Sequence, residues 1–209
     1  MAPAEDPETE AWLSLARQGD ESAVRWLLER HRVRLRRMIG LRLDDRVASR
    51  LDASDIVQET LIDAVKKLDG YLRERPLPFF PWLYGLAIDR LAQAHRHHLR
   101  TLRRRADLEL AGDPRDAAAS RLVDLLAESG TSPSGRLSRE EDCAAIRRAL
   151  AELSVRDREL LVMRYVDQLT FVEIAALLGL SDGAVRLRHL RALQRIGPLL
   201  GASNRGTRA

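Results

Sequence analysis

Several features that mark particular protein classes are scarce or missing in this sequence. The chain of 209 residues has one cysteine, Cys143, so it forms no internal disulfide and no zinc site built from several cysteines. Its first ten residues are acidic and hold two prolines, where a signal peptide would have a basic start and an apolar run. No stretch approaches the roughly 18 consecutive apolar residues of a membrane-spanning helix. We therefore expect a cytoplasmic protein.

Aromatic residues make up only 4% of the chain, and β-branched runs are rare. Leu, Ala, Arg and Glu dominate, and these residues favour helices. Apolar side chains recur at spacings of three and four on both sides of residues 106–138, a segment richer in Gly, Pro and Ser. We predict an all-α fold of two small helical domains, residues 10–105 and 139–200, joined by a flexible linker over 106–138. A short helix can interrupt the linker at about 117–127.

The net charge of +4 hides an uneven distribution of charge along the chain. Four acids and no base lie between residues 52 and 63: Asp52, Asp55, Glu59 and Asp63. The last three are spaced by four and therefore project from one face of a helix. Such a face can bind a basic protein surface or simply be solvated. No His or Gly-rich phosphate loop accompanies it, so we expect no catalytic site, no cofactor and no metal ion.

Five of the nine aromatic residues fall between residues 71 and 84, and residues 95–105 then carry five arginines and no acid. Aromatic rings stack on unpaired bases while cations follow the backbone, so this pairing suits single-stranded DNA. Phe79 and Phe80, which lie among prolines, are the predicted stacking residues of a loop, whereas Trp82 is assigned to the core. The predicted backbone contacts are Arg96, Arg100 and Arg103.

The C-terminal domain divides into four short helices, at about 139–151, 155–166, 171–178 and 182–196. Thr170 and Glu173 form a capping box, Gly179 supplies a turn, and Ser181 caps the last helix. A short helix, a glycine turn and a capped basic helix are the pattern of a helix-turn-helix. The structure is therefore expected to present its last helix to DNA.

The last helix has two faces. Val185, Ala192 and Ile196 recur at helical spacing and are expected in the core, with His189 at its boundary. The residues expected on the other face, free to enter a major groove, are Arg186, Leu187, Leu190 and Arg191. Arginine pairs with guanine edges or phosphates, and the amides near Gly183 can hold a phosphate. The simpler alternative is an amphipathic helix with solvated arginines.

Two sets of motifs together resemble a known family. Residues 52–64, with Trp82-Leu83 and Leu86-Ala87 further on, resemble region two of bacterial sigma factors. Residues 153–161, with Glu173-Ile174-Ala175 and residues 178–186, resemble region four. Both regions stand in the family's order with only a tether between them. The chain is thus similar to sigma factors of the extracytoplasmic-function (ECF) group, which lack region three.

This resemblance implies a non-enzymatic factor that binds RNA polymerase core, through its β′ clamp and β flap, and promoter DNA. The polymerase-binding residues it implies are Asp52, Asp55, Gln58, Glu59 and Asp63. Residues implied for the melted −10 element are Phe79, Phe80, Arg96, Arg100 and Arg103. Those implied for the −35 element are Ser181, Gly183, Arg186, Leu187, Arg188, Leu190 and Arg191. Asp89 and Gln93 stand where the family often carries Asn and Asp, and an anti-sigma protein is left open as a further partner.

Three other interpretations compete with this one. A stand-alone helix-turn-helix regulator explains residues 139–200 but leaves the acidic helix and the aromatic-basic block without a role. An enzyme built on carboxylate-bearing helices needs a pocket or metal that the sequence does not offer. An inactive relative would bind the same partners without initiating transcription.

Overall fold

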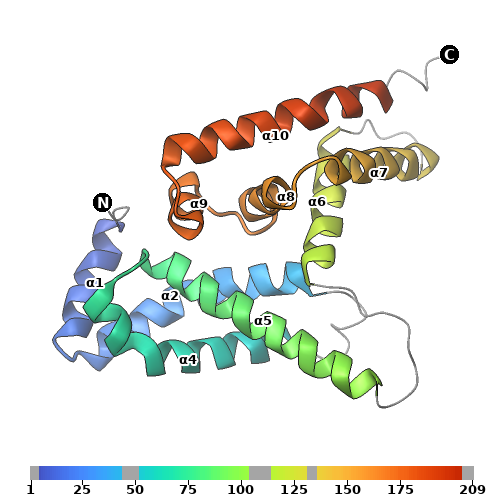
Figure 1. The fold of residues 1–209 in the computed structure, drawn as a ribbon. Helices are drawn as coiled ribbons and strands as arrows, with labels where there is room; N and C mark the ends of the chain where they lie inside the picture. Colours follow the sequence, from blue (N-terminus) through green and yellow to red (C-terminus); the bar gives the residue numbers. More distant parts are fainter. Residues whose placement is uncertain (1–4, 44–51, 104–113, 131–135, 204–209) are drawn as a thin grey trace. The chain divides into compact units, whose positions relative to one another are not determined.

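The computed structural model describes residues 5–43, 52–103, 114–130 and 136–203, and the regular structure within them is entirely helical (Figure 1). By their internal contacts, residues 1–117 form one unit and residues 118–175 with 180–209 form a second. Residues 176–179 connect two helices of the second unit along the chain, and they are described with that unit. This confirms the predicted all-α fold of two units, and each unit is described by itself.

The N-terminal unit is a bundle whose second helix packs against the other three. Its helices are α1 (Pro7–Arg17), α2 (Glu21–Arg42), α4 (Ala53–Glu74) and α5 (Phe79–Arg103). Leu27, Leu35 and Ile39 of α2 are fully buried, as is Leu83 of α5. The long α4 and α5 also pack against each other, and this packing brings Asp63 of α4 to Arg90 of α5.

Local caps begin two of these helices, at Asp20 and Asp52, which are residue types that favour the cap position. The Asp20 carboxylate accepts hydrogen bonds from the amides of Ser22 (2.8 Å) and Ala23 (3.2 Å), and α2 follows. Asp52 accepts from the amide of Ser54 (2.8 Å) at the start of α4. These short-range bonds satisfy amides that the first turn of a helix leaves unpaired.

Two boundaries in this unit differ from those that the local sequence pattern predicts, which are a helix end at Gly70 and a helix start at Pro81. Helix α4 does not end at Gly70 but continues to Glu74, where Arg75 adopts a left-handed backbone (φ 42°). Arg75 is held there by two hydrogen bonds to Glu10, of 2.7 and 2.6 Å. Helix α5 begins at Phe79 instead of Pro81, and the Glu5 carboxylate accepts a hydrogen bond from the Phe79 amide. Both differences depend on residues distant in sequence, which local patterns do not contain.

The C-terminal unit packs its last helix, α10, against α7 and α8. Its elements are α6 (Pro114–Gly130), α7 (Arg136–Ala151), α8 (Val155–Leu161), the π-helical turn η1 (Val162–Val166), α9 (Phe171–Leu178) and α10 (Asp182–Ser203). Helix α6 occupies much of the segment predicted as a linker, and its Ala118, Leu122 and Val123 are buried. Residues 104–113 and 131–135, on either side of α6, lie outside the described residues.

The single helix predicted over residues 155–166 is divided. Helix α8 gives way to η1, whose wider turn is closed by a hydrogen bond from the Asp167 amide to the Val162 carbonyl (3.1 Å). Gln168 then takes a left-handed backbone (φ 57°) and ends the segment. None of the described helices combines the length and apolar character needed to span a membrane.

Candidate functional site

Helices α9 and α10 form the predicted helix-turn-helix. The Glu173 carboxylate accepts from the Thr170 amide (2.7 Å), and Thr170 Oγ1 accepts from the Glu173 amide (3.2 Å), which completes the capping box. Gly179 has φ +65°, the left-handed conformation that the turn requires. Ser181 Oγ then accepts from the Ala184 amide (3.2 Å) and starts α10. These local hydrogen bonds thus determine where both helices of the helix-turn-helix begin.

The inner face of α10 joins the core of the C-terminal unit. Val185, Ala192 and Ile196 are buried. His189 is half-buried, its Nε2 lies 3.0 Å from the Tyr165 hydroxyl, and its ring meets Phe171 edge-on at 5.1 Å. Burial, with a smaller contribution from the positive charge of Arg164, lowers the pKa of His189. The imidazole links the middle of α10 to η1 and α9.

The outer face of α10 is apolar at its centre and basic at its edges. Leu187 and Leu190 are 47% and 51% exposed. Arg186 donates to the Asp182 carboxylate (2.7 Å), and its guanidinium lies over the Phe171 ring, 4.7 Å from the centroid. Arg191 is exposed and forms no ion pair with the residues that the structure describes. This face is therefore open to a partner.

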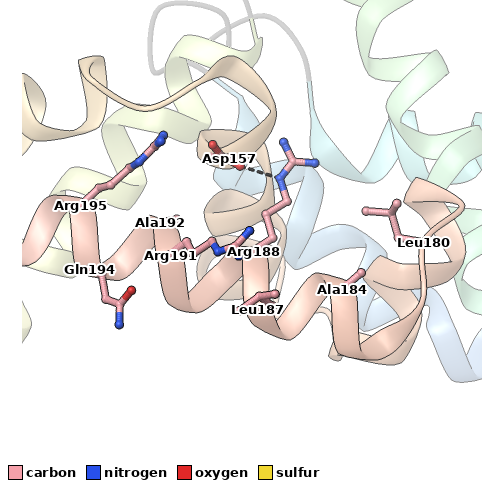
Figure 2. Close-up of a pocket in the computed structure, with 9 residues that line it drawn as sticks. All are labelled: Asp157, Leu180, Ala184, Leu187, Arg188, Arg191, Ala192, Gln194 and Arg195. Atoms are coloured by element: carbon pink, nitrogen blue, oxygen red, sulfur yellow. Dashed lines mark hydrogen bonds and ion pairs between the residues drawn. The ribbon is translucent and has the colours of Figure 1, made fainter.

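Arg188 lies on the same helix but is directed elsewhere. Figure 2 shows its guanidinium pointing at Asp157 of α8, and the Nε–Oδ1 distance is 2.5 Å. The two side chains are only 29% and 15% exposed. Asp157 also accepts from the Ser154 hydroxyl (2.7 Å), and its own amide donates to Ser154 Oγ (3.1 Å). Burial opposes ionisation of Asp157, but the hydrogen bonds from Arg188 and Ser154 give a net lowering of its pKa.

This ion pair was not predicted from the sequence, and it differs from the DNA contact that the family resemblance implies for Arg188. The pair joins α10 to the first turn of α8, which is 31 residues away in the chain. Beside it lies a hollow of about 720 Å³, lined by Arg188, Arg191 and Arg195 together with Leu180 and Leu187 (Figure 2). Arg191 and Arg195 thus place two further guanidinium groups beside that of Arg188, which is paired with Asp157.

The acidic face of α4 divides into an engaged part and an exposed part. Asp63 is only 15% exposed and pairs with Arg90 of α5, whose Nη1 also lies 3.7 Å from the Glu59 carboxylate. Asp52 caps the helix, and the Ser54 amide lowers its pKa. Asp55 and Gln58 are exposed, and Glu59 is 61% exposed. The part of this face open to a partner is thus Asp55, Gln58 and Glu59.

Phe79 and Phe80 are not the exposed loop residues that the neighbouring prolines predict. They begin α5 and are buried, with 0% and 5% of their surface exposed. Phe79 contacts the rings of Tyr71 and Trp82, each at 5.6 Å between centroids, and Arg34 lies over the Phe80 ring at 3.6 Å. The prolines open a helix here instead of a loop, so both rings belong to the core and are not available for base stacking.

Trp82, predicted in the core, is half-buried and stacks on Tyr71 at 4.4 Å. Further along α5, Asp89, Gln93 and Arg96 are exposed and recur at helical spacing on one side. Asp89 forms no ion pair with a described residue. Arg100 and Arg103 lie on the last turns of α5, where side chains are outside the described residues. Among the described residues, no group of three His, Cys, Asp or Glu side chains is placed to hold a metal ion.

Comparison with known proteins gives the following similarities. The family model "Sigma-70, region 4" matches residues 143–196. The ECF RNA polymerase sigma factor SigD of Mycobacterium tuberculosis is 32% identical over 178 residues, covering 85% of this chain and 77% of that protein. The RNA polymerase sigma factor CnrH of Cupriavidus metallidurans is 27% identical over 197 residues, covering 90% and 92%. A solved structure of CnrH with the cytosolic domain of CnrY matches with 23% identity and a TM-score of 0.49, covering 92% of this chain and 96% of that chain.

Proposed function

The chain belongs to the ECF group of RNA polymerase sigma factors, and from this membership we propose which of its surfaces bind polymerase and which bind DNA. As a sigma factor it binds core RNA polymerase, recognises promoter DNA and helps to melt it when transcription begins. The alignment with SigD covers 85% of the chain, so the likeness extends over both units. We expect the protein to act in the cytoplasm with the polymerase and to catalyse no reaction itself. Its control by an anti-sigma protein stays a prediction.

The polymerase-binding surface in this proposal is the exposed part of the acidic face of α4, namely Asp55, Gln58 and Glu59. Asp55 forms no ion pair with a described residue, and Glu59 keeps 61% of its side chain exposed, so both charges are open to a basic partner. The proposed partner surface is the β′ clamp. Asp63 supports this surface instead of meeting the polymerase, because it pairs with Arg90. Asp52 caps α4 through one carboxylate oxygen and is itself exposed at the edge of this surface.

Two further surfaces are proposed to bind promoter DNA. The outer face of α10 would bind the −35 element, because its exposed Arg186 and Arg191 suit a major groove. The basic end of α5, beginning at Arg96, would follow the backbone of the melted −10 strand. Asp89 and Gln93 lie on the same side of α5 and would therefore face that strand as well. The C-terminal unit would also contact the β flap of the polymerase.

The observation that carries this proposal is that one chain presents exposed acids on α4 in one unit and exposed arginines on α10 in the other. Run-off transcription tests it. Purified bacterial core polymerase is supplied with a pool of templates whose upstream region is randomised, with and without this protein. We expect transcripts only when the protein is added. Core polymerase that gains no promoter-dependent transcription from the protein would contradict the proposal.

A charge-reversed variant locates the polymerase surface. Asp55→Lys combined with Glu59→Lys should weaken binding to core polymerase by at least about tenfold, because like charges oppose each other across an interface. Asp69→Lys combined with Glu74→Lys is the matched control, since it reverses one exposed aspartate and one exposed glutamate toward the other end of the same helix. Both proteins should stay folded, with the Asp55–Glu59 variant less stable by about 1 kcal/mol, because Asp55 lies in the first turn of α4, where the helix dipole favours an acid, and Glu59 lies 3.7 Å from Arg90. Equal loss of binding in the control would exclude α4's acidic face as the contact.

A further inference from the structure

We propose that Leu187 and Leu190 read thymine methyl groups in the major groove of the −35 element, and that this pair sets which promoters the factor selects. The proposal rests on the proposed binding of α10 to promoter DNA and goes beyond it, because it names the base feature that is read. It assigns sequence discrimination to the apolar centre of the outer face instead of to its arginines alone.

The first argument is the chemistry of this face. A single exposed leucine is ordinary in a protein surface. Here two leucines, 47% and 51% exposed, lie one turn apart on a face whose exposed charged members are Arg186 and Arg191. Flanking guanidinium groups favour a polyanion over an apolar protein surface. The major groove of DNA presents one apolar group, the C5-methyl of thymine, and aliphatic side chains contact it.

The second argument is the engagement of the neighbouring arginines. Arg188 is paired with Asp157 in a partly buried contact, so its guanidinium is not directed into the groove. Arg186 stays available at the edge of the face, because its pair with Asp182 is exposed, and its guanidinium lies over the ring of Phe171. Of the three, Arg191 alone has no ion pair with a described residue. The base-reading centre of the helix is therefore left to Leu187 and Leu190, with Arg191 one residue beyond them.

The spacing of the leucines predicts the spacing of the thymines. Three residues along a helix advance by about 4.5 Å, and successive base pairs are about 3.4 Å apart. Two side chains at this distance reach methyl groups one or two base-pair steps apart, on either strand. The selected element should therefore contain a pair of thymines at one of these two spacings.

Deoxyuridine provides a sharp test, because it differs from thymidine only by the missing methyl group. Holoenzyme assembled from purified core polymerase and the full-length protein first selects its preferred element from a random DNA pool. Binding is then measured on that element with each thymine replaced in turn by deoxyuridine. We expect about a fourfold loss of affinity at each of two positions, the equivalent of withdrawing one buried methyl group.

Alanine variants assign each methyl group to its leucine. In Leu187→Ala, deoxyuridine at one of the two positions should cost less than about twofold while the other position keeps its full penalty, and Leu190→Ala should show the reverse. Leu125→Ala, which shortens a 40% exposed leucine on α6, should keep both penalties. Binding to core polymerase without DNA should be unchanged in all three variants.

The inference is overturned if no thymine pair is enriched, or if both penalties persist in the two alanine variants. It is also overturned if either variant loses affinity for core polymerase without DNA, since the leucines would then cover a protein surface. Enrichment of a defined element with no dependence on the leucines refutes this inference and leaves the proposed function standing. Failure to enrich any sequence, with no transcript from the pool, refutes both.

Discussion

Replacement of Asp157 by alanine is expected to weaken promoter binding, although it removes a negative charge from beside the proposed DNA-binding helix. The reason is the position of the carboxylate, which holds Arg188 of α10 at 2.5 Å and Ser154 at the start of α8 at 2.7 Å. We interpret the pair as a contact that fixes the orientation of α10 on α8. Its loss should let α10 shift relative to the rest of the unit.

The size of the effect follows from the burial of the pair. Hydrogen bonds to charged groups contribute about 1.5–3 kcal/mol, whereas exposed ion pairs contribute about 0.2–1 kcal/mol. Asp157 is 15% exposed, but Arg188 is 29% exposed and its long side chain can reach water once released. The lower part of the first range therefore applies, about 1.5–2 kcal/mol for Asp157→Ala. A double-mutant cycle with Arg188→Ala should give a coupling of about 1 kcal/mol or more.

The assay is promoter binding by the reconstituted holoenzyme at pH 7, with urea unfolding of the same proteins. The lowered pKa of Asp157 means that the pair stabilises the fold above the usual aspartate range, near pH 4, and is lost as pH falls below it. At pH 7 its contribution is therefore complete. We expect Asp157→Ala and Arg188→Ala to weaken binding similarly, each by about tenfold, and the double variant to be no worse than either.

The opposite sign would refute this interpretation. If Arg188 binds a phosphate directly, Asp157→Ala releases it, so affinity rises or stays equal while Arg188→Ala alone weakens binding and flattens the salt dependence by about one charge. Glu152→Ala controls for the loss of a negative charge, because Glu152 is exposed in the same unit and forms no ion pair with the described residues. It should change neither stability nor affinity appreciably.

Three further predictions follow from single positions. Phe79→Ala should destabilise the N-terminal unit by about 3–5 kcal/mol in thermal unfolding, because the ring is fully buried, whereas an exposed stacking residue would leave the melting temperature unchanged. The pKa of His189 is lowered by burial and by Arg164, so its contribution to stability is complete above the usual histidine range, about pH 6.5, and should decline as pH falls below it. The free energy of unfolding of His189→Gln, measured in urea, should lack this part of the decline. An identical pH dependence in the variant would contradict the lowered pKa of His189. Gly179→Ala should cost about 1 kcal/mol through its positive φ alone, since no atom lies within 4 Å of the added Cβ, and an unchanged unfolding midpoint would show that the turn tolerates a side chain.

The sequence predicts those parts of the fold that depend on short-range hydrogen bonds. The caps at Asp20, Asp52, Thr170 and Ser181 each join groups two or three residues apart, so their residue types identify the helix starts. The inner face of α10 is predictable for a related reason, since a regular helical spacing of Val185, Ala192 and Ile196 leads to burial. Local chemistry is sufficient in these cases.

The sequence predicts poorly what depends on distant residues. Prolines around Phe79 indicate a loop, yet Glu5, 74 residues away, caps a helix there and turns both phenylalanines into the core. The acidic stripe of α4 is visible in the sequence, but the engagement of Asp63 by Arg90, 27 residues further on, is not. The pairing of Arg188 with Asp157 is likewise not visible in the sequence, because it depends on the packing of α10 against α8. A residue type therefore indicates a chemical role, and tertiary contacts decide whether the side chain is available for it.

Site-specific photo-crosslinking in one transcribing complex tests the central claim most directly. The claim is that the N-terminal unit binds polymerase through α4 while the C-terminal unit binds promoter DNA through α10. A photoreactive amino acid at position 59 should crosslink to the β′ subunit, and one at position 190 should crosslink to upstream promoter DNA, in complexes that still produce run-off transcript. Crosslinking of position 59 to DNA, or of position 190 only to polymerase, would contradict the account.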